Sequence, residues 1–136
     1  MDNAVNVKEE YARYRLEKAK EEYAAAVVLY ETEHYRAANN RAYYSIFHAM
    51  RAVLAFDGYD SKKHSGIISA FRKNYIKTGA FSEEMSDIIG NASEIRNASD
   101  YDDMFIASKT ETKLQIENAE KFLHAVTTYV DNRLKE

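Results

Sequence analysis

Arg96 is the side chain in this sequence best suited to hold an anion. It continues an apolar row that repeats at three- and four-residue steps, as one face of a helix does. The row consists of Met85, Ile88, Ile89, Ala92 and Ile95. A guanidinium in line with such a row can grip a phosphate with two parallel hydrogen bonds. Alternatively, Arg96 extends from the edge of the row into water or pairs with a carboxylate.

Two further groups of side chains could do chemistry. The first group, Arg41, Tyr44 and His48, lies on one face of a second expected helix, and Arg51 continues the row. This face is either a hydrogen-bonded polar seam or a place where His48 transfers protons. In the second group, His64 follows Lys62 and Lys63 at the expected start of a helix, where backbone donors and lysines favour an anion. Otherwise His64 caps that helix or lies on the surface.

A metal site is not predicted. Glu31 and His34 have the Glu-x-x-His spacing of helical di-iron proteins, but such a site needs a second pair. Glu120 and His124 are four residues apart instead of three. The chain also has no cysteine, which excludes thiolate ligands and disulfide bonds. Nothing in the sequence requires a cofactor.

The elements that position these side chains are predicted to be helices only. The chain has no proline and four glycines, and its apolar residues recur at helical spacing. We expect helices over residues 7–32, 35–56 and 61–76, a fourth from a cap at Ser82 to about Ser99, and a fifth from a capping box at Ser108 to about Arg133. Short connections favour antiparallel neighbours. The predicted fold is therefore an all-α, up-and-down bundle of four to five antiparallel helices.

Length and charge limit the function further. The 136 residues are enough for one domain, residues 1–136. The net charge of −3, with acidic and basic residues interspersed, is not that of a duplex nucleic-acid binder, although it leaves room for a local basic site. No apolar run approaches the length of a membrane span, and the polar start does not read as a secretion signal. We expect a soluble, cytoplasmic protein.

Three separated motifs resemble the helical HEPN domains of prokaryotes. They are the segment 35–49 (YRAANNRAYYSIFHA), the segment 63–67 (KHSGI), and Arg96 with Asp100 and Tyr101, and the resemblance spans roughly residues 10–130. It implies a bundle of four or five helices and a homodimer. It also implies a gene neighbour that encodes a minimal nucleotidyltransferase, as in a toxin–antitoxin pair, and, in many members, metal-independent cleavage of RNA.

The resemblance departs from the nuclease motif of that family. The motif is an arginine, a polar residue and, after four to six intervening residues, a histidine. Arg96 and Asn97 match its first half, but Tyr101, Asp102 and Asp103 stand where the histidine is expected. The branch with Arg-x-x-x-Asp-Tyr matches better. Because tyrosine titrates near pH 10 and imidazole near 6.5, loss of the histidine weakens acid–base catalysis more than phosphate binding. We therefore expect weak or no RNA cleavage by the isolated protein.

The resulting hypothesis is a HEPN-type component of a toxin–antitoxin or nucleotide-linked defence module. It binds RNA or a nucleotide at a dimer cleft through Arg96, Asn97, Asp100 and Tyr101. The first alternative is a non-catalytic module that docks a minimal nucleotidyltransferase, and the second is a ligand-binding bundle with no nucleic-acid role. Tyr101 is also a candidate acceptor of adenylate from that partner, unless it packs against the second helix and hydrogen-bonds Arg96 or Asp100.

Overall fold

The computed structural model describes residues 6–102 and 104–136, and almost all of them are helical. In this part of the chain the α-helices are α1 (Val7–Glu31), α2 (Tyr35–Ala55), α3 (His64–Phe71), α4 (Glu83–Tyr101) and α5 (Lys109–Leu134). A short π-helix, η1 (Arg72–Ile76), continues α3 by one turn. No strand occurs in the described ranges, so the predicted all-α class is confirmed.

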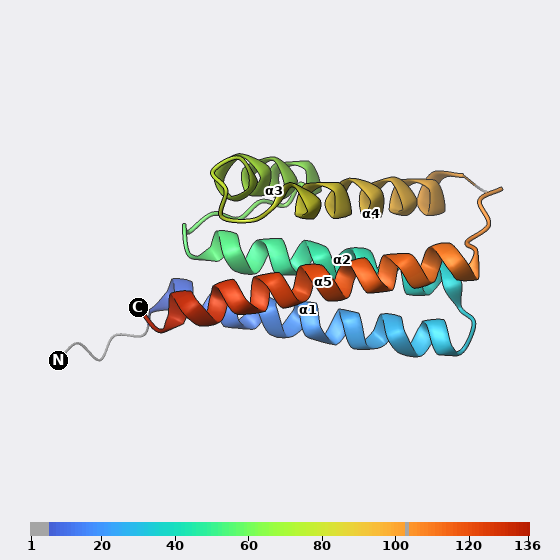
Figure 1. Ribbon diagram of the computed structural model, residues 1–136, viewed down its shortest axis with the longest axis horizontal. Coiled ribbons are helices and arrows are strands. Elements are labelled where there is room, and N and C mark those ends of the chain that lie inside the picture. Colours follow the sequence, from blue (N-terminus) through green and yellow to red (C-terminus); the bar gives the residue numbers. More distant parts are fainter. Residues whose placement is uncertain (1–5, 103) are drawn as a thin grey trace.

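The four long helices run up and down, and α3 lies across them (Figure 1). Consecutive long helices α1 and α2 are antiparallel, as are α4 and α5, whereas α3 is seen nearly along its own axis. The most extensive contacts join α1 to α2, and α2 also contacts α3, α4 and α5. Therefore α2 is the central helix, and the antiparallel arrangement applies to the long helices only.

Small residues allow α2 to take this central place. Its alanines at positions 38, 42, 49 and 52 are buried, so neighbouring helices approach closely. Buried Ser45 donates a hydrogen bond to the carbonyl of Ala19 in α1 at 2.8 Å, which satisfies its hydroxyl in the core. Larger side chains fill the remaining space: Ile46, Phe47, Met50, Val53 and Leu54. These larger residues recur at three- and four-residue steps, as one face of a helix does.

The third helix begins three residues later than predicted, at His64 instead of Ser61. Side chains hold the preceding turn: the Asp60 carboxylate accepts from the Ser61 backbone N–H at 2.9 Å, and Ser61 Oγ accepts from the Lys63 backbone N–H at 3.1 Å. Such local bonds compete with helical ones. His64 therefore begins α3 with Lys63 as its N-cap.

The fourth helix continues two residues past its predicted end at Ser99, to Tyr101. Arg36 of α2 donates to the Ser99 carbonyl at 2.6 Å and to the Asp102 carbonyl at 3.3 Å. A cation at a helix C-terminus donates hydrogen bonds to carbonyls that lack helical partners, and it interacts favourably with the negative end of the helix dipole. This contact explains why the polar segment remains helical as far as Tyr101.

Ser82 and Ser108 are the N-caps of α4 and α5, as predicted, but only Ser108 makes a capping hydrogen bond. Ser108 Oγ accepts from the Glu111 backbone N–H at 3.0 Å, as a capping box requires, but Glu111 accepts from Ser108 Oγ and not from its backbone. Ser82 is the N-cap of α4, although its side chain makes no capping bond. Elsewhere the predicted bounds of α1, α2 and α5 agree with the structure to within one residue.

Candidate functional site

Arg96 lies between α4 and α2, partly buried, with 23% of its side chain exposed. It donates through Nη1 to His64 Nδ1 at 3.1 Å and through Nη2 to the Tyr44 hydroxyl at 3.4 Å. Its Nε lies 3.4 Å from an Asp100 carboxylate oxygen, an ion-pair contact without hydrogen-bond geometry. The guanidinium also lies over the ring of Tyr43, 5.1 Å from its centroid. Helices α2, α3 and α4 thus each supply a neighbour to one cation.

His64 is a neutral imidazole at this position. Arg96 has only donors, so the Nδ1 atom that it contacts must accept, which places the ring proton on Nε2. The Tyr43 hydroxyl lies 2.9 Å from the same Nδ1. Burial, together with the charges of Arg96 and Arg51, lowers the pKa of His64 below its ordinary value. At neutral pH the Nδ1 of His64 therefore carries no proton and accepts from the Arg96 guanidinium.

The polar residues Arg41, Tyr44 and His48 of α2 line one side of this site. The Tyr44 ring makes edge contact with His64 at 5.8 Å between centroids and tilted contact with His48 at 6.3 Å. Arg41 lies over the same ring at 5.1 Å and pairs with Glu22 of α1 at 2.9 Å. Of the predicted candidates, Arg41, His48, His64 and Arg96 lie next to Tyr44, and Asp100 pairs with Arg96.

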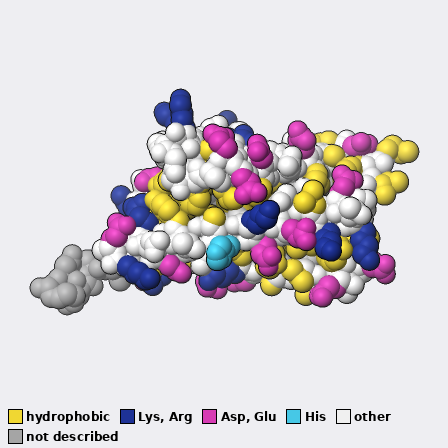
Figure 2. All heavy atoms as spheres, viewed as in Figure 1, with side chains coloured by type: hydrophobic (Ala, Val, Ile, Leu, Met, Phe, Trp, Pro, Cys, Tyr) yellow, Lys and Arg dark blue, Asp and Glu magenta, His cyan; other side chains and the backbone are white. Residues whose placement is uncertain are grey.

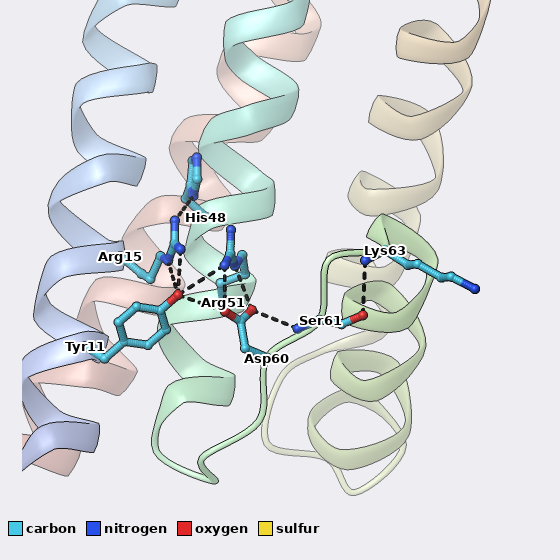
Figure 3. Close-up of polar contacts among 7 residues, drawn as sticks. All are labelled: Tyr11, Arg15, His48, Arg51, Asp60, Ser61 and Lys63. Carbon is cyan, nitrogen blue, oxygen red and sulfur yellow. Dashed lines mark hydrogen bonds and ion pairs between the residues drawn. The ribbon is translucent and has the colours of Figure 1, made fainter.

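A second polar cluster continues the face toward α1, with the Tyr11 hydroxyl at its centre (Figure 3). That hydroxyl donates to Asp60 at 2.8 Å and accepts from the guanidinium groups of Arg15 and Arg51. Arg51 grips Asp60 with two bonds, at 2.9 and 2.7 Å. Arg15 also donates to His48 Nδ1 at 3.3 Å. The cluster connects α1 and α2 to the turn that precedes α3. It therefore holds the N-terminus of α3, where His64 lies.

The charges in this cluster shift two pKa values. Burial alone would raise the pKa of Asp60, but hydrogen bonds from Arg51, Tyr11 and the Ser61 backbone N–H lower it to about 2. Burial, followed by the positive charges of Arg15 and Arg51, lowers the pKa of His48 to about 4. At neutral pH Asp60 is therefore ionised and His48 is neutral.

A hollow of about 540 Å³ opens beside these residues. It is lined by Phe47, Arg51, Asp60, Ser61, Lys62 and His64. The ring of Phe47 lies 4.2 Å from that of His64, centroid to centroid, and the Arg51 guanidinium lies over the Phe47 ring at 5.7 Å. Because Phe47 itself is buried, a ligand in the hollow would meet mainly the polar and charged side chains of its lining.

Two predicted site residues lie outside this arrangement. Asn97 and Tyr101 are exposed, Tyr101 by 83%. The alternative in which Tyr101 packs against the second helix is therefore wrong for this conformation. Its ring projects from the last turn of α4, two residues beyond the carbonyl that Arg36 holds.

Sequence reasoning missed Tyr43 and the cluster around Tyr11. Tyr43 fits the core pattern, and its ring is buried, but its hydroxyl reaches His64. Arg15 is 33 positions from His48, and only the packing of α1 against α2 brings them together. Asp60 is nine positions after Arg51 and reaches it through the turn that follows α2. Tyrosine at the edge of an apolar row is the one signal that could have marked the site, because its polar tip needs a partner when the ring is buried.

Neither a metal cluster nor a membrane helix is found in the described ranges. Among residues 6–102 and 104–136, no three His, Asp or Glu side chains are grouped as metal ligands. Each helix in the same part of the chain is too short or too polar to cross a lipid bilayer.

The sequence is similar to known proteins over most of its length. The sequence profile of the HEPN domain matches residues 12–130. A UPF0332 protein of Thermotoga maritima is 30% identical over 128 residues, 94% of this chain and 97% of its own length. Two proteins of Methanocaldococcus jannaschii, both named putative toxins, are 33% and 34% identical. The alignments cover 85% and 89% of this chain and 78% and 84% of those proteins.

Proposed function

This chain belongs to the HEPN domain family, and from that premise we propose that it is the HEPN component of a toxin–antitoxin or nucleotide-linked defence module. In this role it binds RNA or a nucleotide through Arg96 and the groups around it. The relatives named as putative toxins support the toxin-like part of the proposal. The binding part rests on the geometry of the site.

The observation that carries the proposal is the partly buried guanidinium of Arg96 among aromatic rings. Its two hydrogen bonds, to His64 and Tyr44, leave part of its donor set free. The contacts to Tyr44 and Asp100 are both long, at 3.4 Å, so a phosphate oxygen can replace them at small cost. The partly exposed ring of Tyr44 supplies apolar surface for a base. Lys62 adds positive charge along the adjoining hollow, where Arg51 is paired with Asp60.

Replacing Arg96 with glutamine should weaken binding of a short single-stranded RNA at least about tenfold, because a charge-assisted phosphate contact is worth about 1.5–3 kcal/mol. Fluorescence anisotropy with a labelled oligonucleotide measures the change. The matched control is Arg13→Gln, which removes the same charge from an exposed position on α1. Equal affinity of the two variants would contradict the proposed site.

The proposed cleft lies between two copies of the chain, with α4 of each copy facing the other and two Arg96 side chains on a shared surface. A two-fold interface repeats one patch on both subunits, so it doubles the cations offered to a polyanion. Exposed Asn97 and Tyr101 then lie at the interface instead of in solvent. Light scattering at micromolar concentration tests this arrangement, and a monomeric mass counts against it.

A second candidate function is docking of a minimal nucleotidyltransferase. It is favoured by an exposed apolar tip, defined by Tyr101, Met104 and Ile106, whose residues are 83%, 85% and 85% exposed. Yellow side chains project at that end of the molecule, where the connection between α4 and α5 lies, while charges of both signs cover much of the remaining face (Figures 1 and 2). Exposed apolar groups of this kind mark interaction surfaces.

In that second function Tyr101 is a substrate of the partner. An exposed phenol on the last turn of a helix can enter another protein's active site, and transfer of adenylate to it would add a phosphate next in sequence to Asp100. We expect the chain to gain one adenylate when it is incubated with the neighbouring nucleotidyltransferase and ATP. Intact-mass measurement detects the adduct, and Tyr101→Phe should abolish it. An adduct of unchanged yield in Tyr101→Phe places the modification elsewhere.

A further inference from the structure

The two halves of α4 are held in different ways. The large apolar residues of the first half are buried: Met85, Ile88 and Ile89. Arg72 of η1 also binds this half, because it donates to the Ser86 hydroxyl at 3.0 Å and to the Ser86 carbonyl at 3.1 Å. Beyond Ile89 the buried residues of α4 are Ala92 and Ser99. The first half is therefore anchored in the core, whereas the second half buries little apolar surface.

Gly90 and Asn91 lie where these two halves meet. Glycine in a helix interior is less favourable than alanine, and asparagine is also a poor helix former. Packing does not require a glycine here. Outside the helix itself, the described atom that a Cβ at position 90 would meet is Nη2 of Arg72, at 3.5 Å, which is an ordinary contact. The junction is thus a weak point of the helix backbone that has the character of a hinge.

The second half of α4 meets α2 through polar side chains. Arg36 of α2 donates to the Ser99 carbonyl at 2.6 Å, and Arg96 donates to the Tyr44 hydroxyl at 3.4 Å. Asn40 is one helical turn from both Arg36 and Tyr44, so it lies on the same face of α2. This seam between α2 and α4 therefore depends on hydrogen bonds more than on apolar packing.

Buried polar atoms in this seam lack hydrogen-bond partners. In the described ranges 6–102 and 104–136 they are Asn40 Oδ1, Ser93 Oγ, Arg96 Nε and Ser99 Oγ. One more such atom, Asn39 Oδ1, belongs to a side chain that faces α5 through its bond to Thr112. A buried polar group without a partner is unfavourable, and it gains hydrogen bonds when water reaches it. Separation of this part of α4 from α2 therefore satisfies atoms that the closed seam leaves unpaired.

We propose that residues 93–101, which we call the α4 flap, open as a unit about Gly90, with Arg36 as the latch. Arg36 donates to the carbonyls of Ser99 and Asp102, at the end of the flap, so loss of these bonds frees that end. The anchored first half of α4 stays in place. The flap ends at the edge of the molecule, where α4 leads into the connection to α5 (Figure 1).

Opening of the flap controls the guanidinium of Arg96. In the closed state Arg96 donates to His64 of α3 and Tyr44 of α2, and opening separates it from both. The flap thus acts as a gate for the anion that Arg96 takes, and this part of the inference rests on the proposed function. Exposed Asn97 and Tyr101 lie on the same segment, so a protein bound to that face also biases the flap.

Amide hydrogen exchange followed by NMR, without ligand and at one protein concentration, tests the opening. A detached segment this short does not hold a helix in water, so opening exposes its amides to solvent. A unit that opens about Gly90 gives the flap amides one common opening constant. Protection that instead rises residue by residue from Tyr101 toward Ser93 indicates fraying of a helix end and overturns the proposal.

Gly90→Ala should slow exchange in the flap about fourfold, the preference of a helix interior for alanine over glycine. The added methyl group makes an ordinary contact with Arg72, so the fold is retained. The matched control, Thr128→Ala, raises helix propensity at an exposed position on α5 and should leave exchange in the flap unchanged. Equal exchange in Gly90→Ala and the unaltered chain contradicts the hinge.

Arg36→Gln tests the latch from the opposite direction. Loss of the charged donor should speed exchange in the flap about tenfold or more, because hydrogen bonds from a charged group contribute that much. Arg13→Gln removes the same charge from an exposed position on α1 and should leave exchange in the flap unchanged. Unchanged exchange in Arg36→Gln shows that Arg36 does not hold the flap and overturns its role as the latch.

Binding kinetics with a short single-stranded RNA test the gate. A gate through which the ligand both enters and leaves alters the two rates by the same factor and leaves the affinity unaltered. Gly90→Ala should therefore slow association and dissociation about fourfold each in stopped-flow fluorescence, with the dissociation constant within about twofold. Arg96→Gln, by contrast, should weaken the affinity itself.

The outcomes keep the gate and the proposed function apart. Slower flap exchange in Gly90→Ala with unchanged binding rates overturns the gate, and the proposed function stands if Arg96→Gln binds RNA more weakly. Absence of RNA binding removes the proposed RNA function and the gate together. The exchange measurements, which need no ligand, then decide by themselves whether the flap opens.

Discussion

Replacing Phe71 with alanine should lower the free energy of unfolding by about 3–5 kcal/mol, the usual cost of removing a fully buried phenylalanine. Phe71 is 0% exposed and ends α3. Its ring lies 5.2 Å from that of Phe81 and 5.7 Å from that of Phe122, centroid to centroid, so it joins α3 to α5 and to the turn before α4. Truncation leaves a cavity among rings that cannot all collapse into it, because the interior is closely packed.

Urea denaturation followed by circular dichroism measures this loss. The matched control is Tyr14→Ala, which truncates an aromatic side chain that is 50% exposed on α1 and should cost about 1 kcal/mol or less. Because α3 also carries His64, the Phe71→Ala variant should lose RNA binding together with its structure on heating. A change below about 1 kcal/mol for Phe71→Ala would show that α3 does not pack as described.

The helices could be predicted because periodicity and composition carry that information directly. The apolar positions of α2, from Tyr43 to Leu54, are all buried, and Gly58 and Gly79 adopt positive φ angles of 70° and 86° where the predicted helices end. The errors are local. The end of α4 differs because Arg36, which is 63 positions from Ser99, holds that turn, and a short-range pattern does not contain such a contact. The start of α3 differs because Asp60 and Ser61 bond to neighbouring backbone N–H groups, which the spacing of apolar residues does not register.

The candidate site was only partly predictable, for the same reason. Arg96 stood out because a charge stands at the end of an apolar row, and the row on α2 stood out because its polar residues share a face. Their assembly with His64 depends on the crossing of α3 over the bundle, which no periodicity specifies. The contact between His64 and Arg96 spans 32 positions and that between Arg15 and His48 spans 33, so both arise from packing alone.

His48 should make the protein less stable as the pH falls from 6.5 to about 4. The folded pKa of His48, about 4, lies below the ordinary value of 6.5, because of burial and then the charges of Arg15, Arg51, Lys18 and Arg41. Between these two values the unfolded chain binds a proton that the folded chain does not, which favours unfolding. The stabilising contribution is therefore fully present above pH 6.5 and is lost as the pH falls through this window.

Replacing His48 with glutamine should remove this dependence, since the amide has no proton to gain and its oxygen can still accept from Arg15. Because solvent reaches part of the ring, we expect the loss between about pH 7 and pH 4.5 to be smaller in His48→Gln by about 1–2 kcal/mol, less than the full pKa shift implies. Urea denaturation at several pH values measures the difference. The control His124→Gln removes an exposed imidazole and should retain the dependence. Parallel loss in His48→Gln and the unaltered chain would mean that His48 is protonated in the fold and that the arginines around it do not act as the structure implies.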